Sequence, residues 1–369
     1  MSSITRHAII FRSLPFSYDA RTARHELVFR NEYVVDFVCW GSSKGERGYS
    51  SFSLPRKRGA FAYMALGYIS FSIYLVYFVL RFVRKSDICI FMDLETAFPA
   101  LLLSKWMGAQ AIFDIVDPFF LVKPVRPRLF FRWLEEFVAN NASLVFIPNE
   151  MRRAPYAGQL RQAKVLVVEN VPSFMGSRPA AASKSDKSSE SPITLGYFGG
   201  LEAKHRGLED VVMLVTEDPR LRLIIGGWGE LADAMNSASK MCKRIEFVGP
   251  FDYNNLPMLV ARVDILVGLY YQTRELHRYA SPNKYYEHFY FGKALLTSAL
   301  TPFSGAIENL DSGWVVQDGT EHLRNWAKSL TSKEIVRKGC HAADVWAKTY
   351  QNYYQLIRAK ILPIVGRNR

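Results

Sequence analysis

The sequence is poor in cysteine, in charged residues and in metal-binding patterns. Only four of its 369 residues are cysteines, and they stand far apart with no CxxC pair, which excludes a disulfide-built secreted domain and favours a reducing compartment. The seven histidines form no HxH or HExxH pair, and there is no DxD motif, so we predict no metal site. Charged residues make up 22% of the chain against 49% hydrophobic ones, which excludes disordered and fibrous proteins.

A secretory signal is also lacking. The first apolar stretch, residues 8–11, is too short for a signal peptide and is followed at once by Arg12. We therefore expect a cytoplasmic protein.

The charge that is present is mostly basic and unevenly placed. The formal net charge is +13, which indicates an anionic partner such as nucleic acid, an anionic bilayer or a phosphorylated ligand. Residues 44–85 alone hold eight basic residues and one acidic residue, on both sides of an apolar segment. This pattern favours an anionic membrane surface. The chain has no Lys/Arg-rich recognition helix or RNA-stacking signature, so we predict no nucleic-acid partner.

The apolar segment, residues 60–80, contains no charged residue. As a helix it is about 32 Å long, enough to cross a bilayer. Three interpretations are open: a membrane-spanning helix, a buried core helix, and a helix lying in the membrane interface over about residues 60–83. Strand-like runs on both sides argue against crossing, and basic residues at both ends favour the interface. One face of the helix holds Ile69, Ile73, Val76 and Leu80, and the other Tyr63, Gly67, Ser70, Tyr74 and Tyr77.

Short apolar runs alternate with helical stretches along the rest of the chain, as in parallel α/β sheets. Residues 175–192, rich in Ser, Ala, Pro and charge, interrupt this alternation. We predict two Rossmann-like domains facing across a cleft. They comprise residues 1–172 and 193–330, with a linker at 173–192 and C-terminal helices at 331–369 packing back on the first domain.

Two runs in the second domain are suited to binding an anion. In the first, Gly199 and Gly200 follow a strand and Arg206 stands at the start of a helix, where backbone amides and a guanidinium favour phosphate. An ordinary tight turn is the alternative.

The second run, SPNKYYEHFYFGKALLTS, begins at Ser281. Ser281 or Asn283 can cap a helix that Pro282 helps to begin. Lys284 in the first turn is unfavourable unless an anion offsets it, and Glu287 lies one turn on. The alternative is a capped helix with a Lys284–Glu287 ion pair.

These runs, together with IIGGWGE, IEFVGPF, DILVGLY and SGWVVQDG, resemble the nucleotide-sugar domain of GT-B-fold glycosyltransferases, and are most similar to the family-4 bacterial polysaccharide enzymes. The similarity covers most of residues 193–330. In the first domain, SYDARTARHEL resembles the Asp-Pro-Arg helix start of that group, with Ala20 in place of the proline. There, Asp93, Glu95 and Asp117 occupy the acidic positions at strand ends, where open α/β sheets bind ligands.

The resemblance implies roles for these residues. Glu287 accepts hydrogen bonds from the ribose of a sugar nucleotide, and Arg206 and Lys284 hold its diphosphate. The backbone near Gly249 frames the base. Asp117 faces the reacting carbon or the acceptor hydroxyl as a base or as an electrostatic stabiliser, unless it only caps the turn before a proline. Asp93 and Glu95 are equally well explained as structural.

Two positions depart from the family pattern. Tyr279 replaces the first Glu of a Glu-x7-Glu pair, and Gly200 stands where relatives have an arginine. Retention is slightly favoured over inversion, and neither a metal nor a cofactor is implied.

We therefore predict a glycosyltransferase that moves a hexose-type sugar from a UDP- or GDP-linked donor to a lipid-linked saccharide at the inner face of the cell membrane, in polysaccharide synthesis. A GT-B-fold sugar-nucleotide epimerase and a basic nucleic-acid-binding protein are the alternatives. A group of first-domain aromatics is predicted to line the core and an acceptor groove: Phe119, Phe120, Phe130, Phe131 and Trp133.

Overall fold

The computed structural model describes residues 6–15, 20–41, 49–53, 61–122, 127–156, 158–160, 163–174 and 191–366. The chain forms two compact units. The first comprises Met1–Glu169 with Asn352–Arg369, and the second comprises Asn170–Gln351. Most of the predicted linker lies outside the described residues, as do five of the basic residues before α2: Lys44, Arg47, Arg56, Lys57 and Arg58.

The described strands of the first unit form a parallel sheet in the order β3-β2-β1-β4-β5-β6-β7. All five residues of β4 are buried, as expected for a sheet covered on both faces. The edge strand β3 escaped prediction because its four residues, YSSF, contain no apolar run. The strands are β1 (His7–Arg12), β2 (Val34–Trp40), β3 (Tyr49–Phe52), β4 (Ile88–Met92), β5 (Gln110–Asp114), β6 (Leu144–Ile147) and β7 (Val165–Val167).

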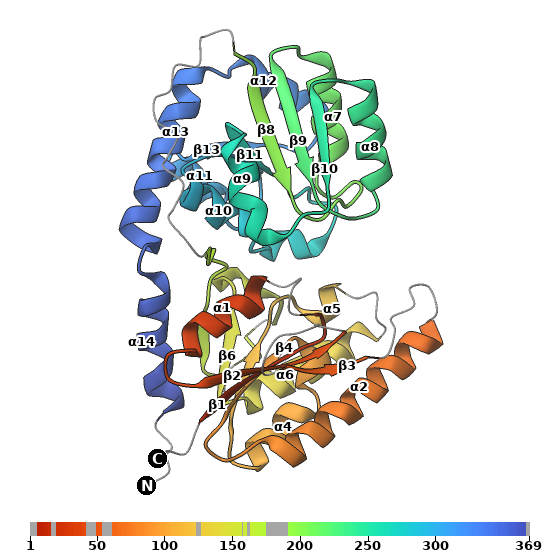
Figure 1. Cartoon of the computed structure of the whole chain (residues 1–369), viewed down its shortest axis with the longest axis vertical. Coiled ribbons are helices and arrows are strands. Elements are labelled where there is room, and N and C mark those ends of the chain that lie inside the picture. The colour runs from red at the N-terminus through yellow and green to blue at the C-terminus, as the bar shows by residue number, and fades with distance from the viewer. Residues whose placement is uncertain are drawn as a thin grey trace. The chain divides into compact units, whose positions relative to one another are not determined.

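Two groups of helices pack on this sheet (Figure 1). In one, α2 contacts α4 and α4 contacts α6; in the other, α1 contacts α14. The Arg358 guanidinium on α14 donates to the carbonyls of Leu27 and Val28, at 2.5 and 2.8 Å, and so satisfies the end of α1. The helices are α1 (Ala20–Phe29), α2 (Phe61–Phe82), α3 (Leu94–Ala97), α4 (Ala100–Trp106), α5 (Phe119–Val122), α6 (Arg128–Asn141), η2 (Glu150–Tyr156) and α14 (Tyr353–Val365).

Helix α2 is apolar on both of its sides. Phe71, Leu75 and Val79 are fully buried against the sheet, where the Phe71 ring lies 5.2 Å from that of Trp40. The opposite side is also apolar but faces outward, and its exposed residues are Leu66, Ile69, Ile73, Tyr77 and Leu80. Ala65–Phe82 is long and apolar enough to cross a membrane by length and composition, and 22% of it is buried.

The second unit repeats the architecture, with a parallel sheet in the order β10-β9-β8-β11-β12-β13. Its strands are β8 (Ile193–Phe198), β9 (Leu221–Gly226), β10 (Ile245–Gly249), β11 (Ile265–Gly268), β12 (Ala294–Ser298) and β13 (Gly313–Val316). Its helices are α7 (Leu208–Glu217), α8 (Ala232–Met241), η3 (Tyr253–Asn255), α9 (Leu256–Ala261), η4 (Glu275–Tyr279), α10 (Asn283–Phe291), α11 (Ser304–Asn309), α12 (Thr320–Lys328), α13 (Ser332–Val345) and η5 (Trp346–Tyr350).

The C-terminal segment divides between the units. Helix α13 packs on α10 and belongs to the second unit, whereas α14 packs on α1 and belongs to the first. The expectation that all of residues 331–369 return to the first domain was too broad. Aromatic rings hold α13 and η5 in place, since Trp346 and Tyr350 contact the rings of Tyr290 and Phe289 on α10.

Candidate functional site

The topology of the second sheet points to one place for a ligand. The chain changes direction between the adjacent strands β8 and β11, and ligands of open α/β sheets bind outside the carboxyl ends of the strands at such a switch point. The loop after β8 carries Gly199, Gly200 and Arg206, and the loop after β11 leads to α10 with Lys284. The structure thus brings both predicted anion-binding runs together.

Lys284 is buried at this switch point. Its Nζ lies 4.2 Å from the centre of the Tyr197 ring, a cation–π contact. Gly199 has a φ of +152°, which favours glycine there, and a Cβ on it would lie 2.9 Å from the same Nζ, so any other residue would displace the lysine ammonium. Burial lowers the pKa of Lys284 to about 8, although Glu287 acts in the opposite direction.

Arg206 is the second cation. Its guanidinium lies 4.1 Å from the centre of the Tyr270 ring and donates to Glu202 at 3.2 Å. Burial opposes its charge, but Tyr270, Tyr197 and Glu202 outweigh this and raise the pKa of Arg206. Its Nε and Nη1 are buried and have no hydrogen-bond partner within the described residues. Buried donors without partners are expected where a cation binds an anionic ligand.

Glu202 is a member of the site that the sequence analysis missed. It accepts from Arg206 and from Arg274, both at 3.2 Å. Burial alone would raise the pKa of Glu202, but the two arginines hold it below its usual value. The sequence did contain a signal for this ion pair, namely the spacing of four residues between the oppositely charged Glu202 and Arg206.

Glu287 is buried on α10 and accepts a 2.8 Å hydrogen bond from the Tyr253 hydroxyl. Among the described residues, no ion pair joins Lys284 to Glu287, so that alternative is wrong. The predicted cap is also wrong: Pro282 occupies the cap position of α10, without a side-chain capping bond, and Asn283 is the first residue of the helix. Proline reaches the cap because its extended backbone leads directly into the first turn.

Two further predicted features lie on other elements of the second unit. The Ser281 carbonyl accepts from the Asn170 side chain at 2.8 Å, which anchors the chain just before α10. Gly249 ends β10 with a φ of +72°, and nothing lies within 4 Å of a Cβ built on it, so its backbone borders open space. Tyr279, the residue that departs from the family pattern, ends η4.

In the first unit, Asp93 is tied into the protein. It follows β4 with a φ of +63° and forms an ion pair with Arg12 of β1. Its Oδ1 also accepts from the backbone amides of Val116 and Asp117, at 3.1 and 3.4 Å. Burial raises the pKa of Asp93 to about 7, although Arg12 acts in the opposite direction. Asp93 therefore positions the loop that carries Asp117.

Asp117 is the accessible member of this acidic group. Its side chain is 45% exposed and forms a 2.9 Å ion pair with Arg152, whose side chain is almost fully buried. Glu95 accepts a 3.4 Å hydrogen bond from the Ser13 hydroxyl. The structure thus gathers Asp93, Glu95 and Asp117 at the carboxyl edge of the first sheet, with Arg152 as a partner that sequence reasoning missed.

A buried carboxyl group lies behind this edge. Glu135 on α6 accepts from the Phe119 amide at 3.2 Å, and burial raises the pKa of Glu135 to about 8. Two aromatic residues predicted to line the core lie instead on the outer side of α6, where Phe130 and Trp133 are 49% and 56% exposed. Their side chains point outward because Glu135, Val138 and Ala139 occupy the buried side of the helix.

Comparison with protein-family models gives no match, and comparison with curated proteins gives none. Solved structures do match over nearly the whole chain. Anabaena HepE in complex with UDP and glucose has a TM-score of 0.67 and 13% identity, covering 97% of this chain and 99% of that chain. Sucrose-phosphate synthase from Thermosynechococcus elongatus has a TM-score of 0.65 and 13% identity, covering 96% and 100%. WaaG, a glycosyltransferase involved in lipopolysaccharide biosynthesis, has a TM-score of 0.64 and 12% identity, covering 96% and 99%.

These neighbours are GT-B glycosyltransferases, and the chain has their fold, with two Rossmann-like α/β units. The predicted fold class is confirmed.

Proposed function

We propose that this chain is a glycosyltransferase that moves a hexose-type sugar from a nucleotide-sugar donor, UDP- or GDP-linked, to a lipid-linked saccharide acceptor. One observation carries the proposal. The buried Lys284 and the largely buried Arg206 interact electrostatically at the switch point of the second sheet, where Lys284 lies beside Gly199. Arg206 also has buried donors without partners in the described part of the chain. Two fixed cations suit a diphosphate, whose charge increases as the sugar leaves.

In this proposal the second unit holds the donor. Arg206 and Lys284 bind the diphosphate, and the start of α10 adds backbone amides. Glu287 accepts from the ribose hydroxyls, with Tyr253 fixing the orientation of its carboxylate. The open backbone at Gly249 frames the base. The neighbouring HepE structures are complexes with UDP and with UDP-glucose, which supports a nucleotide-sugar donor.

The first unit supplies Asp117 to the reacting sugar. Its carboxylate is paired with Arg152, which favours an electrostatic role at a cationic sugar over removal of a proton from the acceptor. We therefore propose transfer with retention. We also propose that no metal and no cofactor take part, because Arg206 and Lys284 provide the positive charge that the leaving diphosphate needs.

We place the enzyme at the cytoplasmic face of the cell membrane, bound peripherally to its anionic surface, in the synthesis of a capsule, an exopolysaccharide or an O-antigen. The support is the outward side of α2, where Leu66, Ile69 and Ile73 are 63%, 58% and 65% exposed. Arg81 and Arg84 follow it and are exposed, as in helices that lie in an anionic interface.

The test is a transfer assay with sugar nucleotides and a polyprenyl-diphosphate-linked acceptor, together with calorimetric binding of UDP. We expect sugar to reach the lipid, and Glu287→Ala to weaken UDP binding by at least about tenfold. Glu308→Ala, at an exposed position of α11, is the matched control and keeps both activities. The proposal is contradicted if the protein consumes no donor and Glu287→Ala binds UDP as tightly as the original protein. Conversion of the donor without acceptor indicates an epimerase instead.

A further inference from the structure

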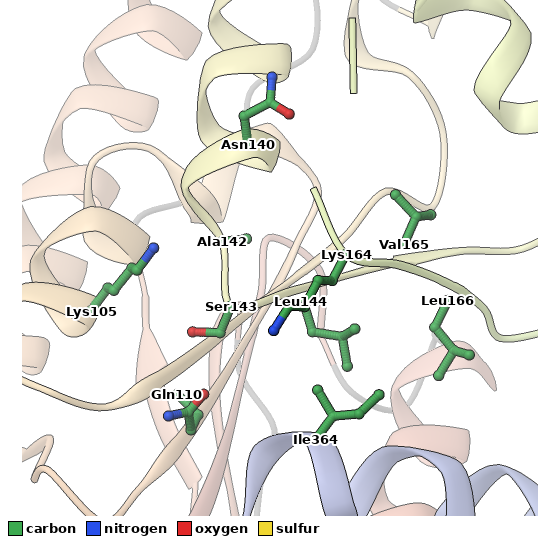
Figure 2. A pocket seen from close by; sticks show the side chains of 10 residues that line it. All are labelled: Lys105, Gln110, Asn140, Ala142, Ser143, Leu144, Lys164, Val165, Leu166 and Ile364. Atoms are coloured by element: carbon green, nitrogen blue, oxygen red, sulfur yellow. The ribbon is translucent and has the colours of Figure 1, made fainter. Parts of the chain in front are cut away.

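A hollow of about 750 Å³ opens in the first unit, away from the candidate site (Figure 2). Gln110, Leu144 and Val165, the first residues of β5, β6 and β7, line it. It therefore lies at the amino edge of the sheet, whereas Asp93 and Asp117 follow the carboxyl ends of β4 and β5. The full lining consists of Lys105, Gln110, Asn140, Ala142, Ser143, Leu144, Lys164, Val165, Leu166 and Ile364.

The charged residues of this lining are all positive. Lys105 is an exposed residue in the last turn of α4, and Lys164 immediately precedes β7; none of the described residues that line the hollow carries a carboxylate. The Lys105 ammonium donates to the Asn141 carbonyl at 2.5 Å and has two further N–H groups. The Lys164 ammonium forms no hydrogen bond or ion pair with any residue that the structure describes. In Figure 2 it points to the side of the hollow where Ser143 and Gln110 lie. Two ammonium groups with neutral polar neighbours suit a phosphate group.

The remaining lining is apolar. Leu144, Val165 and Leu166 form a wall from two adjacent strands, and Ile364 of α14 lies opposite with 38% of its surface exposed. A ligand that fills the hollow therefore presents an anionic group at one end and hydrocarbon at the other.

The hollow also adjoins the elements that we place on the membrane. Trp106, the neighbour of Lys105, is 81% exposed, and α4 packs directly against α2. An exposed tryptophan beside a lysine is typical of protein surfaces at the level of lipid headgroups.

We propose that this hollow binds the phosphate group of an anionic lipid between Lys105 and Lys164, with the start of its apolar chain against Leu144, Leu166 and Ile364. The proposal rests on the membrane association proposed above, but not on sugar transfer.

The experiment is a calorimetric titration of the full chain with dihexanoyl phosphatidylglycerol, kept monomeric so that no bilayer is present. Dihexanoyl phosphatidylcholine, glycerol phosphate and inorganic phosphate are titrated in parallel. We expect phosphatidylglycerol to bind most tightly, and Lys105→Gln with Lys164→Gln to weaken it by at least about tenfold. Lys240→Gln with Lys333→Gln, at exposed positions of the second unit, is the matched control and leaves binding unchanged.

Ile364→Ser tests the apolar wall, and we expect it to weaken phosphatidylglycerol but not glycerol phosphate. Equal affinity for the two lipids, or full binding by the double lysine variant, overturns the proposal. If inorganic phosphate binds as tightly as the lipid, the ligand is a free anion and the lipid assignment is wrong. UDP binding and vesicle binding are measured on the same variants. If a variant loses lipid binding but still binds UDP and vesicles, the hollow is a site distinct from those of the proposed function.

Discussion

The surroundings of Lys284 bring the pKa of its ammonium group close to neutral pH. Burial lowers its pKa to about 8, so the charged fraction falls as pH rises through that value. If the charged form binds the diphosphate, donor affinity is complete below pH 7 and decreases above pH 8.

We predict that the affinity for UDP falls about tenfold between pH 7 and pH 9, following the charged fraction of a group with a pKa near 8. Lys284→Arg keeps its charge throughout this range and flattens the profile. Calorimetric titration at a series of pH values checks this, with Lys240→Gln as the control for the general effect of a lost surface lysine. A pH-independent affinity in the original protein refutes the assignment of Lys284 to the diphosphate.

The runs that carry the candidate donor site were predictable from sequence, although Glu202 was missed, whereas the partners that the fold brings to a charged residue were not. The Gly199 turn and the SPNK run are local patterns with local causes, so both were found. Arg12 lies 81 residues from Asp93, and no periodicity connects them. No sequence pattern connects Arg152 with Asp117 either, because Arg152 belongs to the short η2 segment, whose position is set by β6. The partners of a charged residue thus require the structure.

Helix α2 shows the same limit at the scale of an element. Its range was predicted to within two residues, because a charge-free run ending in arginines fixes it. Which side faces the sheet was not predictable, because both sides are apolar. The structure assigns the docked side to Phe71, Leu75 and Val79 and leaves Ile69 and Ile73 outward.

The two sides of α2 have separable effects. We predict that Ile69→Asn with Ile73→Asn reduces binding to anionic vesicles while changing the free energy of unfolding by less than about 1 kcal/mol. Phe71→Ala, by contrast, leaves a cavity against Trp40 and costs about 3–5 kcal/mol. Vesicle sedimentation and urea unfolding measure the two effects. Unchanged sedimentation of the double variant shows that the outward side contacts something other than a membrane.

At the scale of the molecule, the first unit is built from two separate stretches of chain. Helix α14 buries Ile357, Ile361 and Val365 and supplies Arg358 to the end of α1. Each buried aliphatic side chain stabilises by roughly 1.5–3 kcal/mol. The first unit therefore depends on residues that follow the whole second unit.

Truncation after Gln351 tests this dependence. We predict that amide hydrogen exchange increases across α1, because the helix that covers it is gone, while β8 and β9 exchange as before. Hydrogen-exchange mass spectrometry resolves both regions in one experiment. The milder Arg358→Ala is expected to increase exchange only at the end of α1. Equal increases in both units contradict the division of the chain at residues 170 and 352.

The return of α14 to the first unit has a consequence for biosynthesis. Domains of most proteins fold in the order in which the ribosome makes them. Here the first unit reaches residue 169 without the helix that completes it, and must wait while 182 further residues, those of the second unit, are translated. During that interval the side of α1 that α14 later covers is exposed along with the outward side of α2. The first unit of the nascent chain therefore stays incomplete, with an exposed apolar side on α2, which lengthens the time in which chaperones can bind it.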